Sequence, residues 1–371
     1  MTRVLLAPVT VSPTKALTPS HLKGLLWVDV MRRATALVAD VTYRYSNTTF
    51  NTTRQTLGFW EYLDRTFGDL DYTAHGESEL GELYMRYQAE PVRAPFAALR
   101  PYLRAVEETG WVHPASARLL GLWAGYYERL GMYDPGLTRV QPPEICLAEL
   151  LDLLSARGLC LDERPSGGPV YLDGTRYGLP LRQIVSPEGQ PNYLAGTLRE
   201  LVPLTARYDE IVLVHDRELT EDYVLLDRIL GAFGGNAVRV AVDRVPIDGV
   251  VKSSRYGGWQ GHTLPTMFDA CDGAGSEALR LGIRMHFITV LGKGGGESFH
   301  QELLRRTVKR AGRLLAAADG RTPPLSGAGL AQYVGRCTGG TRHVDPYRLT
   351  AEMLTRHRNP PVRELIEQVY C

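Results

Sequence analysis

The first 45 residues carry the hydrophobic pattern of a strand, a helix and a second strand. Val4–Val9 is a short apolar run, typical of a buried strand. After a loop rich in Pro, Ser and Thr, apolar residues recur at helical spacing from about His21 to Val38, and Ser20 can cap that helix. Val41–Tyr45 then has the composition of a strand. This order predicts the opening βαβ unit of a parallel sheet.

A mainly helical pattern covers residues 77–157, where Pro and Gly interrupt the apolar spacing often. Helices are expected at Leu80–Gln88, Phe96–Thr109 and Leu147–Arg157. Since strands stand on both sides of this stretch, we interpret it as a helical insertion.

Strand patterns return after about residue 166, with helices between them, which is typical of the second half of a doubly wound sheet. Helices are expected at Leu194–Leu204 and Tyr223–Phe233. The expected strands are Pro169–Leu172, Arg182–Val185, Glu210–His215 and Ala237–Val242. From about residue 263 the pattern is helical again.

The whole pattern predicts an α/β fold: a Rossmann-like doubly wound parallel sheet, split by a helical insertion and followed by a helical C-terminal domain. We expect residues 1–76 and 166–262 to form the two halves of a nucleotide-binding domain. Residues 77–165 would be the insertion, and residues 263–371 the C-terminal domain.

Composition narrows the class of protein. Of the 371 residues, 44% are hydrophobic and 22% charged, as in ordinary soluble globular proteins. A net charge of +1 gives no general attraction to nucleic acid or to an anionic membrane. No apolar run reaches the ~18 residues of a membrane helix, and the first run is too short for a signal peptide. Five scattered cysteines without a C-x-x-C pair fit a reducing compartment, so we expect a cytoplasmic protein.

Lysine is scarce, because only five of the 42 basic residues are lysines. Three of the five, Lys15, Lys23 and Lys252, fall in the two segments with the strongest candidate chemistry.

The first of these segments, Lys15–Lys23, joins the first expected strand to the first helix. Ligands of open α/β sheets bind beyond the carboxyl ends of the strands, where a helix N-terminus offers N–H groups and partial positive charge to phosphate. His21 would hydrogen-bond a phosphate or ribose oxygen, with positive charge from Lys15 and Lys23. An exposed histidine and two lysines at an ordinary helix start would have the same pattern.

The second segment, Asp248–Gly258, follows the last expected strand and is rich in small residues. Lys252, Ser253 and Ser254 suit a loop that closes over a triphosphate, since lysine supplies a point charge and hydroxyl groups bind the remaining oxygens. Such charge is useful where a pyrophosphate leaves. A basic surface loop without a ligand would have the same composition.

Together the two segments resemble the two signatures of class I aminoacyl-tRNA synthetases. Thr18–His21 falls on the H-x-G-H motif, with His21 on its second histidine. Val250–Ser254 resembles K-M-S-K-S, with Lys252 on the second lysine and Ser253 on the last serine. Ser12 and Lys15 fall on a polar position and a lysine of the arginyl-type loop before the first motif.

A third match makes the resemblance more specific. Ile184–Ala195 resembles the arginyl-type strand, turn and helix R-S-D-G-T-P-T-Y, and the apolar run Tyr208–Val214 follows as in that family. The three segments have the family's order and spacing, and the resemblance covers roughly residues 1–60 and 166–265.

The chain also departs from the signatures. The first histidine of H-x-G-H is Thr18 and its glycine is Ser20, while Val250 and Val251 replace the first lysine and serine of K-M-S-K-S. The acidic motif after the family's fourth strand is replaced around His215–Glu218. These changes imply either a modified mode of ATP binding or a loss of activity.

The resemblance implies ATP-dependent activation of an amino-acid carboxylate as an aminoacyl-adenylate, with Mg²⁺ bound to ATP and no other metal. From this resemblance we expect His21, Lys252 and Ser253 to be catalytic. ATP would also be bound by Lys15, Thr18, Ser20 and Ser254. The substrate pocket would contain Thr10, Ser12, Asn192, Tyr193 and Asp216.

The acyl acceptor is a separate question. Only about 105 residues follow the second signature loop, which is small for the family's anticodon-binding domain. We therefore expect a small-molecule amine as acceptor, in an amide-forming ligase of specialised metabolism similar to the cysteine ligases of mycothiol synthesis. One alternative is a tRNA-dependent ligase or transferase, since residues 301–371 hold 12 basic against 6 acidic residues. A solvated helical face would have the same excess of basic residues. The second alternative is a non-catalytic, synthetase-like nucleotide-binding protein.

Overall fold

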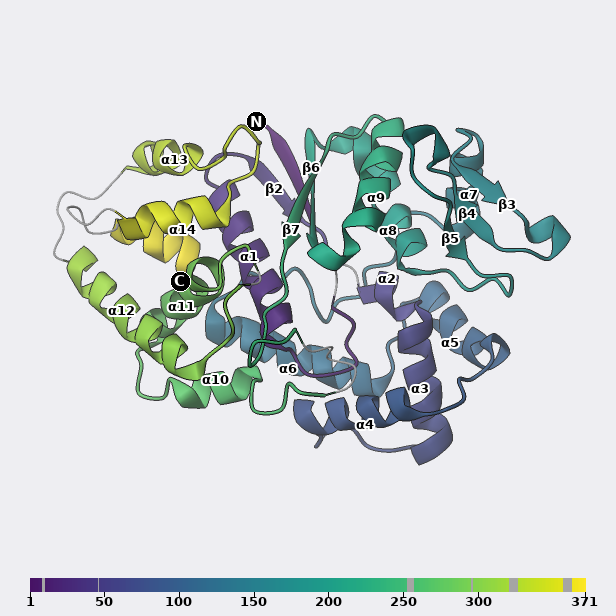
Figure 1. Cartoon of the computed structure of the whole chain (residues 1–371), viewed down its shortest axis with the longest axis horizontal. Coiled ribbons are helices and arrows are strands. Elements are labelled where there is room, and N and C mark those ends of the chain that lie inside the picture. Colours follow the sequence, from purple (N-terminus) through teal and green to yellow (C-terminus); the bar gives the residue numbers. More distant parts are fainter. Residues whose placement is uncertain (9–10, 46, 252–256, 295, 320–325, 356–361) are drawn as a thin grey trace.

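The computed structural model describes residues 1–371 except 9–10, 46, 252–256, 295, 320–325 and 356–361. At its centre is a parallel sheet of four strands in the order β2-β1-β6-β7 (Figure 1). The inner strands are β1 (Arg3–Pro8) and β6 (Glu210–Asp216). The outer strands are β2 (Asp40–Tyr43) and β7 (Ala237–Val242). Two strands from each end of the α/β pattern therefore share one sheet, as the sequence predicts.

Side chains of the inner strands alternate between two hydrophobic cores, one on each face of the sheet. Val4 and Leu6 of β1 belong to the core that contains α1 (Pro19–Thr35). Leu5, between them, belongs to the core of α8 (Tyr193–Leu201) and α9 (Thr220–Ala232). Because successive side chains of a strand point to opposite faces, a fully apolar strand requires cover on both sides.

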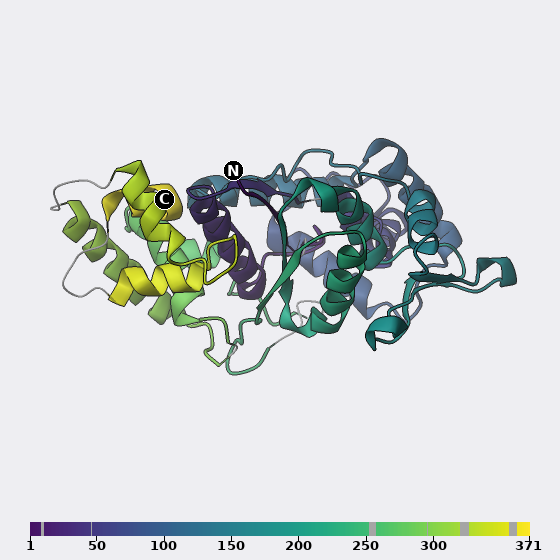
Figure 2. The same ribbon diagram turned by 90° about the horizontal axis from the view of Figure 1, so that it is seen from above.

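The small strands near residue 170 differ from the prediction. The strands β3 (Cys160–Asp162), β4 (Val170–Leu172) and β5 (Arg182–Val185) form a separate antiparallel sheet and do not join the parallel one. In Figure 2 this sheet lies at the end of the molecule opposite the C-terminal helices. The segments between these strands are short and hold only single 3₁₀ turns, Arg164–Ser166 and Thr175–Tyr177. A parallel pair would need a longer crossover, so antiparallel pairing is what such connections allow.

Six helices lie between β2 and β3 in the described part of the chain. They are α2 (Asn47–Asn51), α3 (Arg54–Phe67), α4 (Glu77–Ala89), α5 (Phe96–Thr109), α6 (Pro114–Leu130) and α7 (Leu147–Ser155). The bounds of α5 coincide with the sequence prediction. The helices from α4 to α7 fall within the predicted insertion, residues 77–165, whereas α2 and α3 precede it.

The C-terminal helices pack on α1 and extend its core. They are α10 (Leu264–Ala270), α11 (Ser276–Met285), α12 (Gln301–Asp319), α13 (Gly327–Gly335), α14 (Pro346–Thr355) and α15 (Arg363–Leu365), with π-helical segments at His286–Val290 and Ile366–Tyr370. A fully buried ion pair joins the two parts: Arg284 Nη2 donates to Asp29 Oδ2 at 2.6 Å. The same carboxylate group binds Arg33 and the Tyr133 N–H.

The fold is thus α/β and Rossmann-like, with a helical insertion and a helical C-terminal region, as predicted. The four domain boundaries stay a prediction, since the α1-side core runs through residues on both sides of them. Within the described residues, none of the helices combines the length and apolarity that crossing a membrane requires.

Candidate active site

A cavity of about 960 Å³ lies at the carboxyl ends of the parallel strands. Pro8 of β1, Val214 of β6 and Val242 of β7 reach it, together with the N-terminal turn of α1. Its other wall comes from the start of α3 and from the β5–α8 connection. Of the predicted site residues, it is lined by Ser12, Lys15, Ser20, His21, Asn192, Tyr193 and Asp216. The cavity is where open α/β sheets bind ligands.

His21 lies in the first turn of α1. Its Nδ1 accepts a hydrogen bond from the Thr18 N–H at 3.2 Å and lies 3.2 Å from Thr18 Oγ1. Burial, with the nearby cations Lys15 and Arg244, lowers the pKa of His21 to about 3. The ring is therefore neutral at pH 7, and with Nδ1 accepting, its proton is on Nε2. The ring also has a hydrogen bond to the Ala16 backbone, which opposes the fall in its pKa, and it lies beside the partial positive charge of the helix start.

The loop before α1 is held by buried groups. Lys15 is 6% exposed, and its Nζ lies 5.0 Å from the ring centre of Tyr84. Glu77, which the sequence analysis missed, accepts from the Leu17 N–H at 2.6 Å and from Trp123 Nε1 at 2.9 Å. Glu77 lies three residues before the predicted helix Leu80–Gln88, a position that gives no sign of this role.

Two predicted ATP-binding residues, Thr18 and Ser20, make structural contacts within the protein. Thr18 is the N-terminal cap of α1, is buried, and is not among the cavity-lining residues. The Ser20 hydroxyl accepts a hydrogen bond from the Val245 N–H at 3.0 Å, so it joins α1 to the chain just after β7. Lys23 is buried as well, which lowers its pKa to about 8, and it does not line the cavity.

Arg244 is a cavity residue that the sequence analysis missed. It lies two residues beyond the end of β7. Its Nε lies 3.3 Å from Asp216 Oδ2, and its Nη1 lies 2.8 Å from Glu218 Oε2. Burial raises the pKa of Asp216, and Arg244 opposes this shift. The signal was present, because a charged residue right after a parallel strand is placed at the ligand edge.

At the opposite wall, polar atoms are already used by the protein. Asn192 Oδ1 accepts from the N–H groups of Leu194 and Ala195, and so caps α8, while its Nδ2 donates to the Gln183 carbonyl. The Tyr193 hydroxyl donates to Asp222 Oδ2, and its ring stacks on Phe50 with centres 6.5 Å apart. Burial, followed by Asp222, raises the pKa of Tyr193. Tyr193 therefore presents its ring rather than its hydroxyl to the cavity.

The remaining predicted residues, Thr10, Lys252, Ser253 and Ser254, lie outside the described residues. Val251, within the second signature, lines the cavity. An isolated bridge between Ile247 and Phe299 fixes the chain a few residues earlier.

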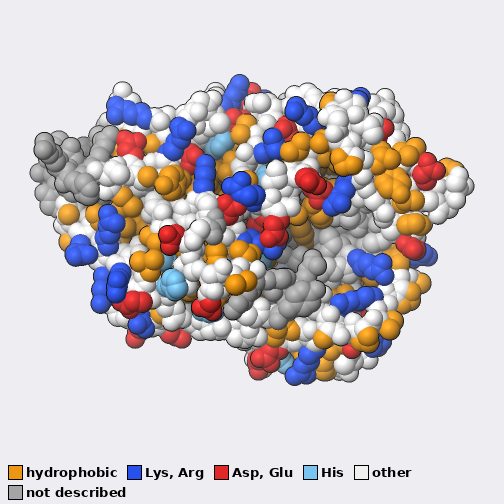
Figure 3. Space-filling model, in the orientation of Figure 1, with side chains coloured by type: hydrophobic (Ala, Val, Ile, Leu, Met, Phe, Trp, Pro, Cys, Tyr) orange, Lys and Arg blue, Asp and Glu red, His pale blue; other side chains and the backbone are white. Residues whose placement is uncertain are grey.

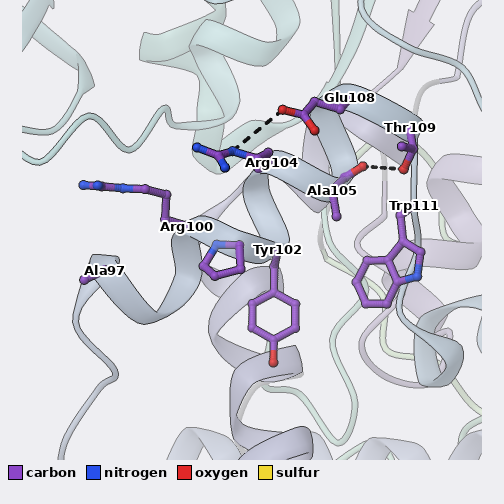
Figure 4. Close-up of a pocket in the computed structure, with 9 residues that line it drawn as sticks. Ala97, Arg100, Tyr102, Arg104, Ala105, Glu108, Thr109 and Trp111 are labelled. Carbon is purple, nitrogen blue, oxygen red and sulfur yellow. Dashed lines mark hydrogen bonds and ion pairs between the residues drawn. The ribbon is translucent and has the colours of Figure 1, made fainter.

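A second hollow, of about 590 Å³, runs along α5 and involves none of the parallel strands (Figure 4). Its polar groups have partners within the protein. Arg104 Nε lies 3.7 Å from Glu108 Oε1, and the Tyr102 hydroxyl donates to Asp64 at 2.6 Å. In the described part of the chain, no three His, Cys, Asp or Glu side chains are grouped to hold a metal ion.

Solved structures with the same fold are class I aminoacyl-tRNA synthetases. The arginyl-tRNA synthetase of Thermus thermophilus matches with a TM-score of 0.64 and 15% identity, over 100% of this chain and 80% of that one. A Campylobacter jejuni protein assigned as an arginyl-tRNA synthetase matches with a TM-score of 0.56 and 15% identity, over 100% of this chain and 90% of that one. The methionyl-tRNA synthetase of Mycobacterium tuberculosis was solved in complex with methionyl-adenylate. It matches with a TM-score of 0.51 and 12% identity, over 100% of this chain and 82% of that one.

No protein-family model matches the sequence, and no curated protein matches it by sequence either. At these identities the structural matches establish the fold of the chain. They confirm the resemblance drawn from the two signatures at that level.

Proposed function

We propose that this protein activates the carboxylate of an amino acid with ATP, forming an aminoacyl-adenylate and pyrophosphate. One observation carries the proposal: the N-terminus of α1, His21, Lys15 and Arg244 converge on a cavity at the strand ends. The fold supports it, since a synthetase with this fold was solved with methionyl-adenylate bound. A volume of about 960 Å³ is in the range of pockets that enclose a ligand of this size.

The reaction mainly requires that the carboxylate and ATP be held in position and that positive charge lie near the phosphates. A carboxylate oxygen attacks the α-phosphorus, the bond to the bridging oxygen breaks, and pyrophosphate leaves with the electron pair. In the proposal His21 Nε2–H donates to a phosphate oxygen, and Lys15 and Arg244 lower the energy of the negative charge that develops. Lys252, Ser253 and Ser254 bind the leaving pyrophosphate.

Thr18 and Ser20 act on ATP through the α1 turn they stabilise, because their own polar groups have protein partners. The amino acid is proposed to lie among Thr10, Ser12, Asn192, Tyr193 and Asp216. Mg²⁺ is proposed to arrive with the phosphates of ATP, and its charge would add to that of the basic side chains.

For the acyl acceptor we propose a small-molecule amine, giving an amide. The net charge of +1 supports a small acceptor over a polynucleotide. A specific observation favours tRNA as the second candidate: one face of α12 exposes the basic side chains of Arg305, Arg306, Lys309, Arg310 and Arg313. Figure 3 shows Lys and Arg side chains gathered over this helix, at the lower left. A tRNA gel shift that weakens steeply with salt would favour this second candidate.

The experiment that tests activation is ATP–pyrophosphate exchange with each of the twenty amino acids, for the wild type and Lys252→Ala. Lys293→Ala is the matched control, since Lys293 pairs with Asp345 at the surface. Exchange with one amino acid, lost in Lys252→Ala and kept in Lys293→Ala, is the expected result. No exchange together with no ATP binding in a titration would contradict the proposal and favour a non-catalytic protein.

A further inference from the structure

The loop between β1 and α1 carries groups of the basic cavity wall. Lys15 lines the cavity, and the Ala16 backbone is hydrogen-bonded to the His21 ring. The described part of this loop contains no helix or strand that would hold it in place. Instead, Ser116 Oγ of α6 donates to the Pro13 carbonyl at 2.6 Å. The placement of the loop therefore depends on helices of the insertion.

Glu77, at the start of α4, makes the second contact of this kind. Its Oε1 accepts from the Leu17 N–H at 2.6 Å and from Trp123 Nε1 at 2.9 Å, and its Oε2 accepts from the Tyr126 hydroxyl at 3.2 Å. Glu77 is only 5% exposed, so water is a poor substitute for these donors. Held from α6 by two donors, the carboxylate fixes the backbone that carries Lys15.

The same face of α4 contacts the chain that follows the second signature in sequence. Gly81 is four residues after Glu77, so the two positions lie on one face of the helix. A Cβ added to Gly81 would be 2.6 Å from the buried ring of Trp259 and 3.6 Å from the Ala16 backbone nitrogen. The loop before α1 and the chain at Trp259 therefore meet over α4, at a point where only glycine leaves enough room.

We infer that Glu77 is a positioning residue for the activation step, and that α4 fixes the loop before α1 relative to the chain at Trp259. The inference rests on the proposed function, because it concerns where basic groups stand relative to the phosphates of ATP. Glu77 does not line the cavity, so it acts through the loop. A shift of about 1 Å in groups that stabilise a transition state can cost ~100-fold in rate.

The test compares Glu77→Ala with Glu79→Ala. Glu79 lies in the same turn of α4 and also accepts from a backbone N–H, that of Gly76 at 2.7 Å, but it is exposed and holds the start of its own helix. In Glu77→Ala the kcat of ATP–pyrophosphate exchange should fall ~10- to 100-fold, with the KM of the amino acid changed by less than ~3-fold. Glu79→Ala should keep the wild-type kcat. Glu77→Gln retains an acceptor for the Leu17 N–H and should recover most of the rate.

Gly81→Ala is the second variant, and it serves if Glu77→Ala does not fold. Alanine favours a helix over glycine, but here its Cβ would push the Trp259 ring away. Gly125→Ala on α6 is the matched control, since nothing lies within 4 Å of the Cβ added there. Gly81→Ala should lower kcat at least ~3-fold, whereas Gly125→Ala should leave it unchanged.

Amide hydrogen exchange measures the positioning without the reaction. Glu77→Ala should speed the exchange of peptides that cover residues 11–18 and 257–262 by at least ~10-fold, because both segments lose their fixed contact with α4. Glu79→Ala should leave both peptides as in the wild type.

The outcomes separate the inference from the proposed function. A wild type without pyrophosphate exchange would contradict the function; faster hydrogen exchange in both peptides of Glu77→Ala would still support the positioning by α4. Unchanged hydrogen exchange in that variant would overturn the inference. So would a wild-type kcat in folded Glu77→Ala and Gly81→Ala, which leaves the function standing. Equal losses of kcat in Glu77→Ala and Glu79→Ala would overturn it as well, since they would report the stability of α4 alone.

Discussion

The two walls of the cavity are built in opposite ways. The wall at α1 and β7 gathers three basic residues, Lys15, His21 and Arg244, and after burial the two cations contribute to the low pKa of the neutral His21 ring. The wall at the β5–α8 turn carries Glu188, and the polar atoms of Asn192 and Tyr193 there bind the protein itself. Arg244 is already paired with Asp216 and Glu218, so the positive charge that suits this wall to phosphate comes mainly from Lys15 and the start of α1. The second wall is suited to recognition by shape.

The largest expected effect comes from breaking the cationic wall at Arg244. Arg244→Ala should lower the rate of pyrophosphate exchange by about 100- to 1000-fold, since it removes a charge near the phosphates and leaves Asp216 without its partner. Arg244→Lys should recover part of the rate. Arg239→Ala on β7, whose partner is Asp227, is the control and should stay near wild type. An unchanged rate in Arg244→Ala would mean that this wall does not bind the phosphates.

His21 offers the next largest effect. Replacement by alanine should reduce exchange by about 10- to 100-fold, since one neutral donor is lost while the charges remain. His21→Asn retains an N–H donor, so its exchange rate should lie between those of the wild type and His21→Ala. Steady-state kinetics would show the loss in the ATP-dependent step. A loss confined to the KM of the amino acid would contradict the assignment of His21 to the phosphate wall.

The same residue makes a prediction about pH. Folding lowers the pKa of His21 from 6.5 to about 3, so the unfolded chain binds a proton in that range and the native chain does not. Its contribution to stability is therefore complete above pH 6.5 and is lost as the pH falls toward 3. Urea unfolding of His21→Asn should show a shallower loss over that interval, by up to about 1.4 kcal/mol per pH unit. Parallel curves would contradict the burial of a neutral ring.

At the β5–α8 wall, Tyr193→Phe should separate stability from binding. The hydroxyl binds Asp222, which also pairs with Arg182 at 2.8 Å. Its loss should cost about 1–2 kcal/mol of unfolding free energy, while amino-acid affinity changes by less than about 3-fold. Chemical denaturation and calorimetry on one preparation test both. A large loss of affinity at unchanged stability would mean that the hydroxyl turns toward the substrate.

The smallest effect is expected at Asn192. Asn192→Ala removes the cap of α8 and should lower the free energy of unfolding by about 1 kcal/mol. Asn192→Ser can still cap the helix, so its loss should be smaller. Thermal denaturation would rank the two. Equal losses would indicate that the bond from Nδ2 to the Gln183 carbonyl, and not the cap, holds this turn.

The sequence predicted most elements and the edge of the sheet where the cavity lies. Phe96–Thr109 was correct at both ends, because its apolar spacing is regular and Gly110 ends it in the left-handed conformation. The pairing of the strands at 170–172 and 182–185 was wrong, since an apolar run does not reveal which strand it pairs with. Arg244 and Glu77 were missed, as their partners are 26 and more residues away in sequence.

By itself, then, the sequence determined the order of strands and helices and the two signature segments, because periodicity, caps and turns are local properties of the chain. Tertiary structure alone decided which polar groups remain available to a ligand. Asn192 and Tyr193 look like ligand-binding residues in sequence, yet their polar atoms bind α8 and Asp222. Glu77 has nothing distinctive in sequence, yet its buried carboxylate accepts a hydrogen bond from the loop that carries Lys15. Availability depends on what else lies within hydrogen-bond distance, and only the folded chain brings those groups together.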